Sequence, residues 1–478
     1  MTTLLKVLRF LGPIFLFFSM LVVLPSYMIS YFDNIADNGL LIILLLSIFY
    51  SLVIRFTLRK QKFIYTPRDG FLITFVSWVL VSLIAALPFY SFGMSYVDSF
   101  FEAVSGLTTT GSTSISSLSE LPNYLLMYRQ LLQWAGGVGL VIVVLAIIPA
   151  VSGGVKVLQA ETSGFAEKSF SPRLRETARS LLMFYLIITF LCVSAYWFAG
   201  MSLFDAFAHS FSTVSIGGFS TYDQNFGHFQ NTGIELVAIG FMIISSTNFG
   251  LHFLAVTKFR FTSYLKNDEF IFFLIVLVSA IVVSILLLLL KEGFVLSDAL
   301  RYGLFQTISI VTTSGFTLIP LDSFGQAVPF FIFIVAFIGA CSGSVGGGMK
   351  AWRILILLRV AVDSITKLMH PNAVSTSKIN GVKIENSQIE SVFAFIAFYI
   401  AFFLFFLFIL IFQDIDFYSA FSATTAAINN LGPGLGVFSE NYSSLTDLGK
   451  CTLAFAMIVG RLELFGVLIL FFPSFWKN

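Results

Sequence analysis

Four short strings of small and hydroxylated residues are the part of this 478-residue sequence best suited to chemistry. They are TTTG (108–111), SIGG (215–218), TTSG (312–315) and NNLG (429–432), and each ends at a glycine. Backbone carbonyls, supplemented by Thr or Ser hydroxyls, can replace the water shell of a monovalent cation and still release the ion. Glycine belongs in such strings, because turning successive carbonyls toward one axis needs backbone angles that a β-carbon makes costly. The strings therefore predict an ion-binding site.

The predicted site takes every residue of the four strings. Its members are Thr108, Thr109, Thr110, Gly111, Ser215, Ile216, Gly217, Gly218, Thr312, Thr313, Ser314, Gly315, Asn429, Asn430, Leu431 and Gly432. The fourth string matches the pattern least well. The alternative interpretation is that Gly, Ser and Thr only allow membrane helices to pack closely. One string would not separate the two interpretations, but four strings at matched positions favour the ion site.

The strings recur within a repeated unit. Each ends an apolar and small-residue segment of about three helical turns, and the segments are DSFFEAVSGLTTTG (98–111), DAFAHSFSTVSIGGF (205–219), GLFQTISIVTTSGF (303–316) and SAFSATTAAINNLG (419–432). The glycines lie 107, 97 and 117 residues apart, which predicts a repeat of helix, short helix, polar string and helix. Asp98 and Asp205 are expected at or beside the N-cap of a short helix.

The elements that must position these strings are membrane helices. Hydrophobic residues make up 57% of the chain and charged residues only 11%, which predicts an all-α polytopic membrane protein. A spanning helix needs about 20 mostly apolar residues. Ten windows meet that need, near 11–31, 39–55, 71–92, 126–150, 180–200, 233–256, 269–290, 328–358, 389–412 and 450–473. The first window has no cleavage site after it and is interpreted as a retained helix rather than a signal peptide.

The distribution of basic residues predicts the orientation. With both termini in the cytoplasm, 22 of the 27 Lys and Arg residues fall on the inner side, and only Arg129, Lys291, Arg301, Lys450 and Arg461 do not. All four strings then lie toward the outer side. An irregular loop at membrane depth is tolerated only where it is buried or lines a cavity, so four loops around one axis are expected. The partially negative C-terminal ends of the four short helices would face a cation at the centre.

Two further features stand out in the apolar windows. The run GACSGSVGGGMK (339–350) interrupts a window with Gly343, Gly346, Gly347 and Gly348, which disfavour a helix and allow an irregular segment along a cavity. It does not match a phosphate-binding loop, because Lys350 lacks the preceding Gly and the following Ser or Thr. A kinked packing helix remains the alternative.

Arg461 is a lone cation inside the last window, where such a residue usually faces a bundle interior or a watery cavity. The alternative is that it pairs with an acid such as Glu463 and only holds helices together. Residues two apart do not share a helix face, which weakens that particular pairing.

Other classes of function find little support. The three cysteines and four histidines are scattered singly, so neither a disulfide framework nor a metal site is indicated. No nucleophile and base pair, nucleotide-binding motif or organic-cofactor motif is evident, so we expect no enzyme. The basic residues form no cluster beyond what orientation explains, which argues against nucleic-acid binding.

Together these motifs resemble the Trk/Ktr/HKT superfamily of potassium transporters, and specifically its bacterial TrkH-type membrane subunit. The most specific elements are STVSIGGFST (212–221), TTSGFT (312–317), CSGSVGGGMKAWR (341–353) and GRLELF (460–465). The resemblance covers nearly the whole chain. It implies two extra N-terminal transmembrane helices (1–68) followed by four pore repeats, at 69–157, 158–260, 261–370 and 371–478.

The resemblance also implies roles for individual residues. One glycine of each repeat would contribute to a potassium selectivity filter, namely Gly111, Gly218, Gly315 and Gly432. In the second string Gly218 is preferred to Gly217, because a Phe follows Gly218 just as Phe316 follows Gly315. Potassium would be bound through Thr109, Thr110, Ile216, Gly217, Thr313, Ser314, Asn430 and Leu431. Sodium-permeable relatives carry Ser at the first filter glycine, so Gly111 favours potassium. The glycine-rich run with Lys350 would be an intramembrane gating loop, and Arg461 would lie close to it in the permeation path.

Its implications extend to partners and location. Members are homodimers in the bacterial cytoplasmic (inner) membrane and bind a cytosolic nucleotide-binding regulatory subunit (TrkA-like), which would dock on inner loops at 156–179, 258–266 and 360–388. The leading prediction is potassium uptake through a filter with a gating loop beneath it. The alternative is a sodium- or proton-coupled secondary transporter of another small solute, with its site near the midplane at a repeat interface. No residue pattern indicates a coupling ion, and the membrane potential alone supplies ~2.3 kcal/mol per charge per 100 mV.

Overall fold

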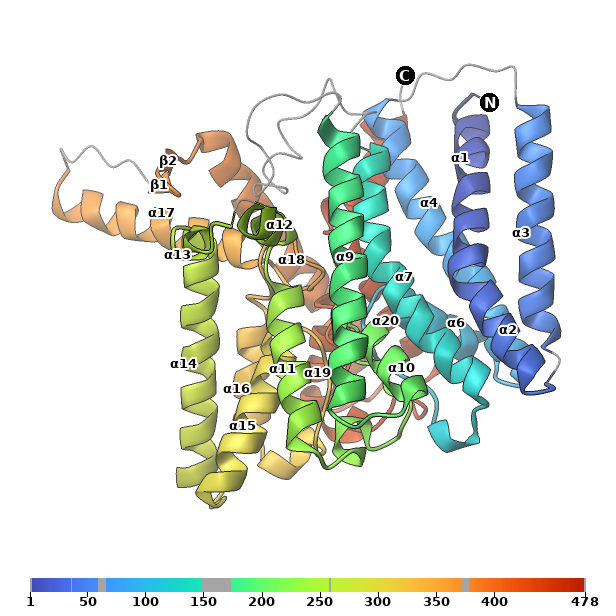
Figure 1. Cartoon of the computed structure of the whole chain (residues 1–478). Helices are drawn as coiled ribbons and strands as arrows, with labels where there is room; N and C mark the ends of the chain where they lie inside the picture. The colour runs from blue at the N-terminus through green and yellow to red at the C-terminus, as the bar shows by residue number, and fades with distance from the viewer. Residues whose placement is uncertain are drawn as a thin grey trace.

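The computed structural model describes residues 2–35, 37–58, 66–147, 173–257, 259–371 and 378–476. Over these residues the chain is almost entirely helical (Figure 1), and its only strands there are β1 (Lys378–Ile379) and β2 (Val382–Lys383), which form a small antiparallel hairpin. The prediction of an all-α membrane protein is confirmed. The predicted boundary between the first two repeats, at 157/158, lies outside the described residues, and the limits of all four repeats stay predictions.

The long helices run roughly parallel to one another (Figure 1). They are α1 (Thr2–Phe18), which continues through a π-helical turn (Ser19–Val23) into α2 (Leu24–Phe32), α3 (Asn38–Thr57), α4 (Pro67–Ala85) followed by α5 (Leu87–Phe92), α7 (Asn123–Ile147), α9 (Arg173–Phe198), α14 (Asp268–Leu290) and α18 (Asn386–Ile411). The N- and C-terminal ends of the chain lie on the same face of the molecule. An even number of membrane crossings gives this arrangement, as the ten windows require.

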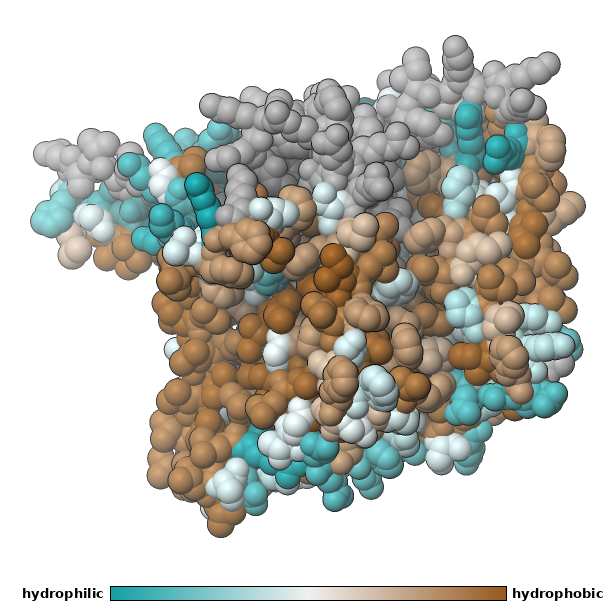
Figure 2. Space-filling model, in the orientation of Figure 1, coloured by the Kyte–Doolittle hydropathy of each residue, from teal (hydrophilic) through white to brown (hydrophobic). Residues whose placement is uncertain are grey.

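Hydropathy marks the membrane band on the surface. Six helices among the described residues are long and apolar enough to cross a membrane, and two bent pairs of helices pass the same test when each pair is taken together. In the space-filling view a broad hydrophobic zone crosses the molecule, with hydrophilic residues gathered along its lower edge and on the arm at the upper left (Figure 2). The chain is therefore a multi-pass membrane protein.

Two of the predicted spans are bent rather than straight. The window near 233–256 contains α11 (Thr232–Ser246) and α12 (Phe249–Thr257), which meet at 98°. The side chain of Asn248, between them, accepts a hydrogen bond from the Gly250 N–H at 2.8 Å and starts the second helix. The window near 450–473 contains α20 (Asp447–Arg461), which meets α21 (Phe465–Leu468) and the 3-10 turn after it at 107°. Hydropathy is unaffected by such breaks, so the windows did not reveal them.

The window near 328–358 is wrong as a continuous span. Helix α16 (Ala327–Ala336) ends early, residues 337–350 are irregular, and α17 (Ala351–Met369) runs crosswise to the other helices (Figure 1). Positive φ angles at Gly339 (71°), Gly343 (72°) and Gly348 (79°) account for the break, because residues with a β-carbon avoid this region. The expected interruption by the glycine-rich run is confirmed.

Four short helices lie in the half of the molecule away from both chain ends (Figure 1). They are α6 (Tyr96–Leu107), α10 (Leu203–Val214), α15 (Leu296–Val311) and α19 (Phe417–Ile428), and each precedes one polar string. Small single-turn helices complete the chain at α13 (Thr262–Leu265) and α22 (Pro473–Trp476), together with several 3-10 turns.

The N-termini of two short helices differ from prediction. Ser95 and Ser202 are the N-caps of α6 and α10, and their hydroxyls accept the backbone N–H of Asp98 and Asp205 at 3.1 Å. Each serine hydroxyl also donates to the carboxylate of that aspartate at 2.7 Å. The expectation that the aspartates stand at or beside the N-cap is wrong by three residues, because a serine occupies the capping position and the aspartate reinforces it from the first turn.

The long helices approach the ends of two short helices at glycines. A β-carbon on Gly136 of α7 would lie 1.9 Å from the Leu107 carbonyl oxygen, and one on Gly460 of α20 would lie 2.2 Å from the Ile428 carbonyl oxygen. Both carbonyls belong to the last residue of a short helix. These two glycines therefore set how closely a spanning helix supports the start of a string.

We expect Gly136→Ala to destabilise the protein by about 1–3 kcal/mol, because its methyl group cannot be accommodated without moving α7 away from α6. Thermal unfolding of the purified protein, followed by scanning fluorimetry, measures the change. Gly240→Ala is the matched control: it also lies inside a helix, nothing stands within 4 Å of its added β-carbon, and it should be neutral or slightly stabilising. Equal unfolding temperatures for the two variants would contradict the packing argument.

Candidate ion-binding site

The four glycine strings meet in a closed ring. Each terminal glycine lies against the carbonyl oxygen of the residue that precedes the glycine in the next string. A β-carbon on Gly111 would stand 2.1 Å from the Gly217 oxygen, and the same contact runs from Gly218 to Ser314 (2.2 Å), from Gly315 to Leu431 (2.2 Å) and from Gly432 back to Thr110 (2.5 Å). The structure thus brings together segments up to about 320 residues apart in the chain, in sequence order and with the same contact at each step.

The ring needs glycine for two reasons. The φ angles of the four terminal glycines are 89°, 81°, 78° and 103°, a region that side chains disfavour. Any β-carbon there would also collide with a carbonyl oxygen of the neighbouring string. The choice of Gly218 over Gly217 agrees with this geometry, since Gly217 is not among the residues with positive φ.

Each short helix ends in the same way. The residue two places before the terminal glycine is left-handed, with φ of 56° at Thr109, 53° at Ile216, 64° at Thr313 and 51° at Asn430. The next N–H reaches back five residues, as from Thr110 to the Ser105 carbonyl at 2.9 Å, and the same bond occurs in the other three strings at 2.8 Å. This is the Schellman ending of a helix. Holding a non-glycine residue there costs about 1–2 kcal/mol, so the surroundings must impose the conformation.

Most string hydroxyls in the ring bond within the protein. Those of Thr108, Ser215 and Thr312 donate to helix carbonyls one turn earlier at 2.7 Å. The Thr108 oxygen also lies 2.7 Å from the Thr110 hydroxyl. The hydroxyl hydrogens of these three residues therefore have acceptors within the protein.

The fourth string, which matches the pattern least well, is held by amide side chains. The Asn430 side chain donates to the Thr110 hydroxyl and to the Met457 carbonyl, both at 3.0 Å. The Tyr399 hydroxyl donates to the side-chain oxygen of Asn429. Asn430 thus joins the fourth string to the first string and to α20, and Asn429 joins it to α18.

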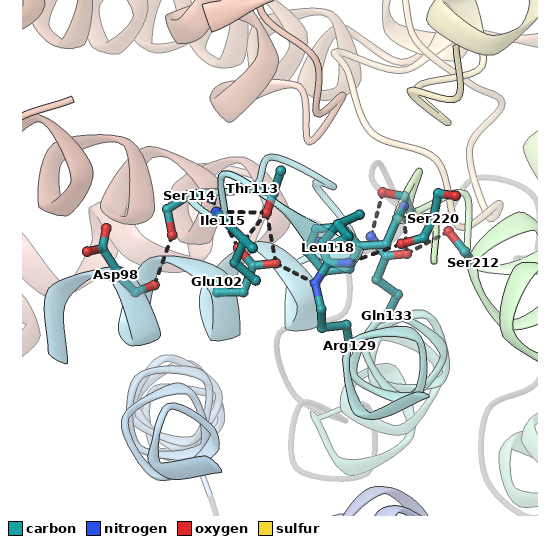
Figure 3. Close-up of polar contacts among 12 residues, drawn as sticks. Asp98, Glu102, Thr113, Ser114, Ile115, Leu118, Arg129, Gln133, Ser212 and Ser220 are labelled. Carbon is teal, nitrogen blue, oxygen red and sulfur yellow. Dashed lines mark hydrogen bonds and ion pairs between the residues drawn. The ribbon is translucent and has the colours of Figure 1, made fainter. Parts of the chain in front are cut away.

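A buried polar cluster supports the first and second strings (Figure 3). The Arg129 side chain on α7 forms an ion pair with Glu102 on α6 at 2.7 Å, and the two side chains are 1% and 0% exposed. Glu102 also accepts the hydroxyl of Thr113 and the N–H of Ser114, just beyond the first glycine. Gln133, one turn along α7, reaches the second string.

Sequence reasoning missed Glu102, Arg129 and Gln133. Two signals were available. Arg129 is one of the few basic residues that orientation leaves unexplained, and the second string alone carries two glycines. A further regularity supports the cluster: Glu102 and His209 each stand nine residues before a terminal glycine, and the His209 ring lies 3.0 Å from the Ser220 hydroxyl, two residues after that glycine, as Glu102 contacts Thr113.

The glycine-rich segment 337–350 contacts the third and fourth strings. The N–H of Gly347 donates to the Thr313 hydroxyl at 2.7 Å, and a β-carbon on Gly347 would lie 1.8 Å from the Asn429 oxygen. A β-carbon on Gly346 would lie 3.2 Å from the Thr312 carbonyl oxygen. The segment therefore touches the ring where the helices end.

The remaining predicted gating residues of the segment 337–350 have contacts within the segment and with the helices around it. The Gly343 carbonyl accepts the N–H of Phe249 at 3.1 Å, Gly348 packs against Gly339, and the Lys350 ammonium donates to the Gly346 carbonyl. The Glu269 carboxylate on α14 accepts the N–H of Ser342 at 2.5 Å.

Arg461 reaches the same segment from α20. Its guanidinium donates to the Val345 carbonyl at 2.9 Å and to the Gly136 carbonyl at 2.9 Å, and the residue is 5% exposed. Glu463 forms its ion pair with Arg353 instead. The alternative pairing of Arg461 with Glu463 is therefore not what the structure contains.

A cavity of ≈ 580 Å³ lies on the other side of the ring. All four terminal glycines line it, together with Asp223, Glu440 and other polar residues of the loops that follow the strings. Among the residues that the structure describes, no three His, Cys, Asp or Glu side chains are placed to hold a metal ion. The ring thus has a polar cavity on one face and the glycine-rich segment on the other.

We expect Arg461→Ala to raise the rate of ion flux several-fold, because the segment 337–350 loses a bond at Val345 and the path loses a positive charge. Isotope flux into proteoliposomes measures the rate at equal protein content. Arg55→Ala, at an exposed arginine in the last turn of α3, serves as the control and should leave the rate unchanged. A rate at or below that of the unmodified protein for Arg461→Ala would contradict the gating assignment.

Comparison with known proteins gives a consistent result. The profile of the TrkH family, described as a cation transport protein, matches residues 39–478. The chain is 38% identical over 481 residues to the Trk system potassium uptake protein TrkH of Vibrio parahaemolyticus, with 99% of each chain covered. It is 37% identical over 477 residues to the protein of the same name from Halomonas elongata, again with 99% of each covered.

The structural comparison agrees. The crystal structure of the potassium transporter TrkH from Vibrio parahaemolyticus matches this structure with a TM-score of 0.88 and 36% sequence identity, covering 99% of this chain and 100% of that one. The resemblance drawn from the strings and the glycine-rich run is confirmed at the level of the family. This chain belongs to the TrkH family of cation transport proteins.

Proposed function

We propose that this chain carries potassium across the cytoplasmic membrane as the membrane subunit of a Trk-type uptake system. The single observation that carries the proposal is the ring of four strings, in which carbonyl oxygens and terminal glycines repeat the same contact four times. The names of the relatives, which describe potassium uptake, support it.

In this mechanism the ring supplies the oxygens that replace the water shell of the ion. Carbonyl dipoles attract a monovalent cation without the full charge that would trap it. The short helices add to this attraction, because the negative ends of their dipoles lie at the strings. Ions enter from the polar cavity, and discrimination between potassium and sodium follows from the number and spacing of oxygens in the ring.

The segment 337–350 acts as the gate in this mechanism. It lies against the strings at Gly347 and is tied to Arg461 through Val345. Displacement of the segment would open the path from the ring to the inner side. The ends of the chain lie on the face opposite the short helices (Figure 1), which fits cytoplasmic termini and an outward-facing cavity.

The proposal extends to partners. The protein acts as a homodimer and responds to a cytosolic nucleotide-binding subunit, which docks on inner loops near 258–266 and 360–388; the names of the relatives, which describe a Trk system, support a multi-component assembly. The described parts of these loops expose the basic residues Arg260, Lys266 and Lys367. The third predicted docking loop, 156–179, lies largely outside the described residues.

The central test is ion flux into proteoliposomes of the purified chain, with potassium, rubidium, sodium and lithium in parallel. Potassium and rubidium should move well ahead of sodium and lithium. Gly111→Ser should reduce that preference by tenfold or more, because its hydroxymethyl group would meet the Gly217 carbonyl oxygen. Gly240→Ser, in open surroundings on α11, is the matched control and should retain the preference.

The same assay separates the alternative function. If the chain carries another solute, either no monovalent cation will move or Gly111→Ser will leave the ion preference untouched. Either result would overturn the assignment of the ring as the filter.

Docking of the regulatory subunit is tested separately. The triple variant Arg260→Gln, Lys266→Gln and Lys367→Gln should lose most of the nucleotide response of flux in the presence of the cytosolic subunit, because the subunit no longer meets these charges. Basal flux measured without that subunit should persist. Lys291→Gln, an exposed lysine at the other end of α14, is the control. A full nucleotide response in the triple variant would contradict docking on these loops.

A further inference from the structure

Gln133 links the helix that follows the first string to the second string of the ring. It lies on α7, one turn after Arg129, and Figure 3 shows Arg129 directed at Glu102 and Gln133 beside Ser212. Gln133 is fully buried. A buried carboxamide needs several hydrogen bonds, so its partners reveal what it holds.

The partners of Gln133 all belong to one loop. Its side-chain nitrogen donates to the Gly217 carbonyl at 2.6 Å, and its side-chain oxygen accepts the Ser212 hydroxyl at 2.7 Å and the Phe219 N–H at 3.2 Å. These three residues span the end of α10, the second string and the residue after its glycine. One side chain therefore fixes the whole turn.

The carbonyl that Gln133 holds is part of the ring. The Gly217 oxygen is the one that lies against Gly111 of the first string. A change in its position alters the contact between the first and second strings directly. Gln133 itself comes from the helix that follows the first string, so the link joins two repeats.

Residue 217 must be a glycine because Gln133 packs against its α-carbon. A β-carbon there would lie 2.3 Å from the Gln133 side-chain oxygen, and its backbone does not require positive φ. The equivalent residues of the other strings, Thr110, Ser314 and Leu431, all have side chains. The second glycine of the second string thus makes room for Gln133 rather than serving the backbone.

The Arg129 ion pair fixes the same face of α7. Besides Glu102, the guanidinium donates to the Ser220 carbonyl at 3.1 Å and lies 4.0 Å from the centre of the Phe219 ring. Glu102 in turn holds Thr113 and Ser114. The residues after both glycines are therefore tied to α7, which prevents Gln133 from shifting relative to the first string.

We propose that Gln133 is a positioning residue for ion selectivity, which sets the place of the Gly217 carbonyl in the ring through its hydrogen bonds. The inference rests on the proposed function of the ring as a potassium filter. Selectivity between ions of different size depends on how firmly and how closely the oxygens are held. Gln133 would then act on selectivity without touching the ion.

The test compares the ratio of potassium to sodium flux in Gln133→Leu with that of the unmodified protein. Leucine retains similar bulk and removes all three hydrogen bonds. We expect the ratio to fall about tenfold, because losing the net stabilisation of about one hydrogen bond changes an equilibrium by about that factor. A ratio does not depend on how much of the protein is folded, so a loss of stability alone would not move it.

Gln130→Leu is the matched control, because Gln130 lies on the same helix, is equally buried, and its side-chain amide atoms have no hydrogen-bond partner among the described residues. It should keep the ratio of the unmodified protein. An unchanged ratio in Gln133→Leu would overturn the inference. A ratio near one in the unmodified protein would instead overturn the proposed function.

A second variant distinguishes the loss of hydrogen bonds from the loss of packing. It also replaces the first test if Gln133→Leu does not fold. In Gln133→Ala combined with Gly217→Ala, the new methyl on residue 217 enters the space left by the amide, but the hydrogen bonds stay lost. We expect the ratio to remain about tenfold low. Recovery of the original ratio would show that Gln133 only fills space, and would overturn the inference.

Discussion

Peptide groups that leave a helix inside a membrane must find partners in the protein, because lipid offers none. Four times in this chain a short helix ends at membrane depth and its backbone turns away into a string. The strings meet this constraint by Schellman endings and by contacts among themselves, which close into a ring. Terminal glycines are the condition for closure, since a β-carbon on any of them would displace the next string.

The surrounding helices and buried charges fix the position of that ring. Helices α7 and α20 approach the ends of short helices through Gly136 and Gly460, so the strings start from fixed points. The buried charges near the ring have partners of opposite charge or backbone carbonyls: Arg129 meets Glu102, and Arg461 meets carbonyls of the segment 337–350 and of α7. A buried cation without such partners would be costly, which makes these contacts restrictive as well as stabilising.

The sequence was sufficient to predict the membrane class, most spans, the four strings, the four glycines and the break near 339–350. It was insufficient for features that depend on distant contacts. The bends at Asn248 and after Arg461 leave hydropathy unchanged, and the crosswise course of α17 follows from the irregular segment before it. Gln133 acts 84 residues away from Gly217, and only the second glycine of that string hinted at it.

The measurement that tests the central claim most directly is the position of bound ions in crystals of the protein grown with rubidium. Anomalous scattering locates rubidium independently of the oxygens around it. If the ring binds the transported ion, rubidium peaks will lie inside the ring formed by the carbonyls of Thr110, Gly217, Ser314 and Leu431, and will be absent from crystals grown with sodium alone. Peaks confined to another part of the membrane region, or no peak within the ring, would contradict the account.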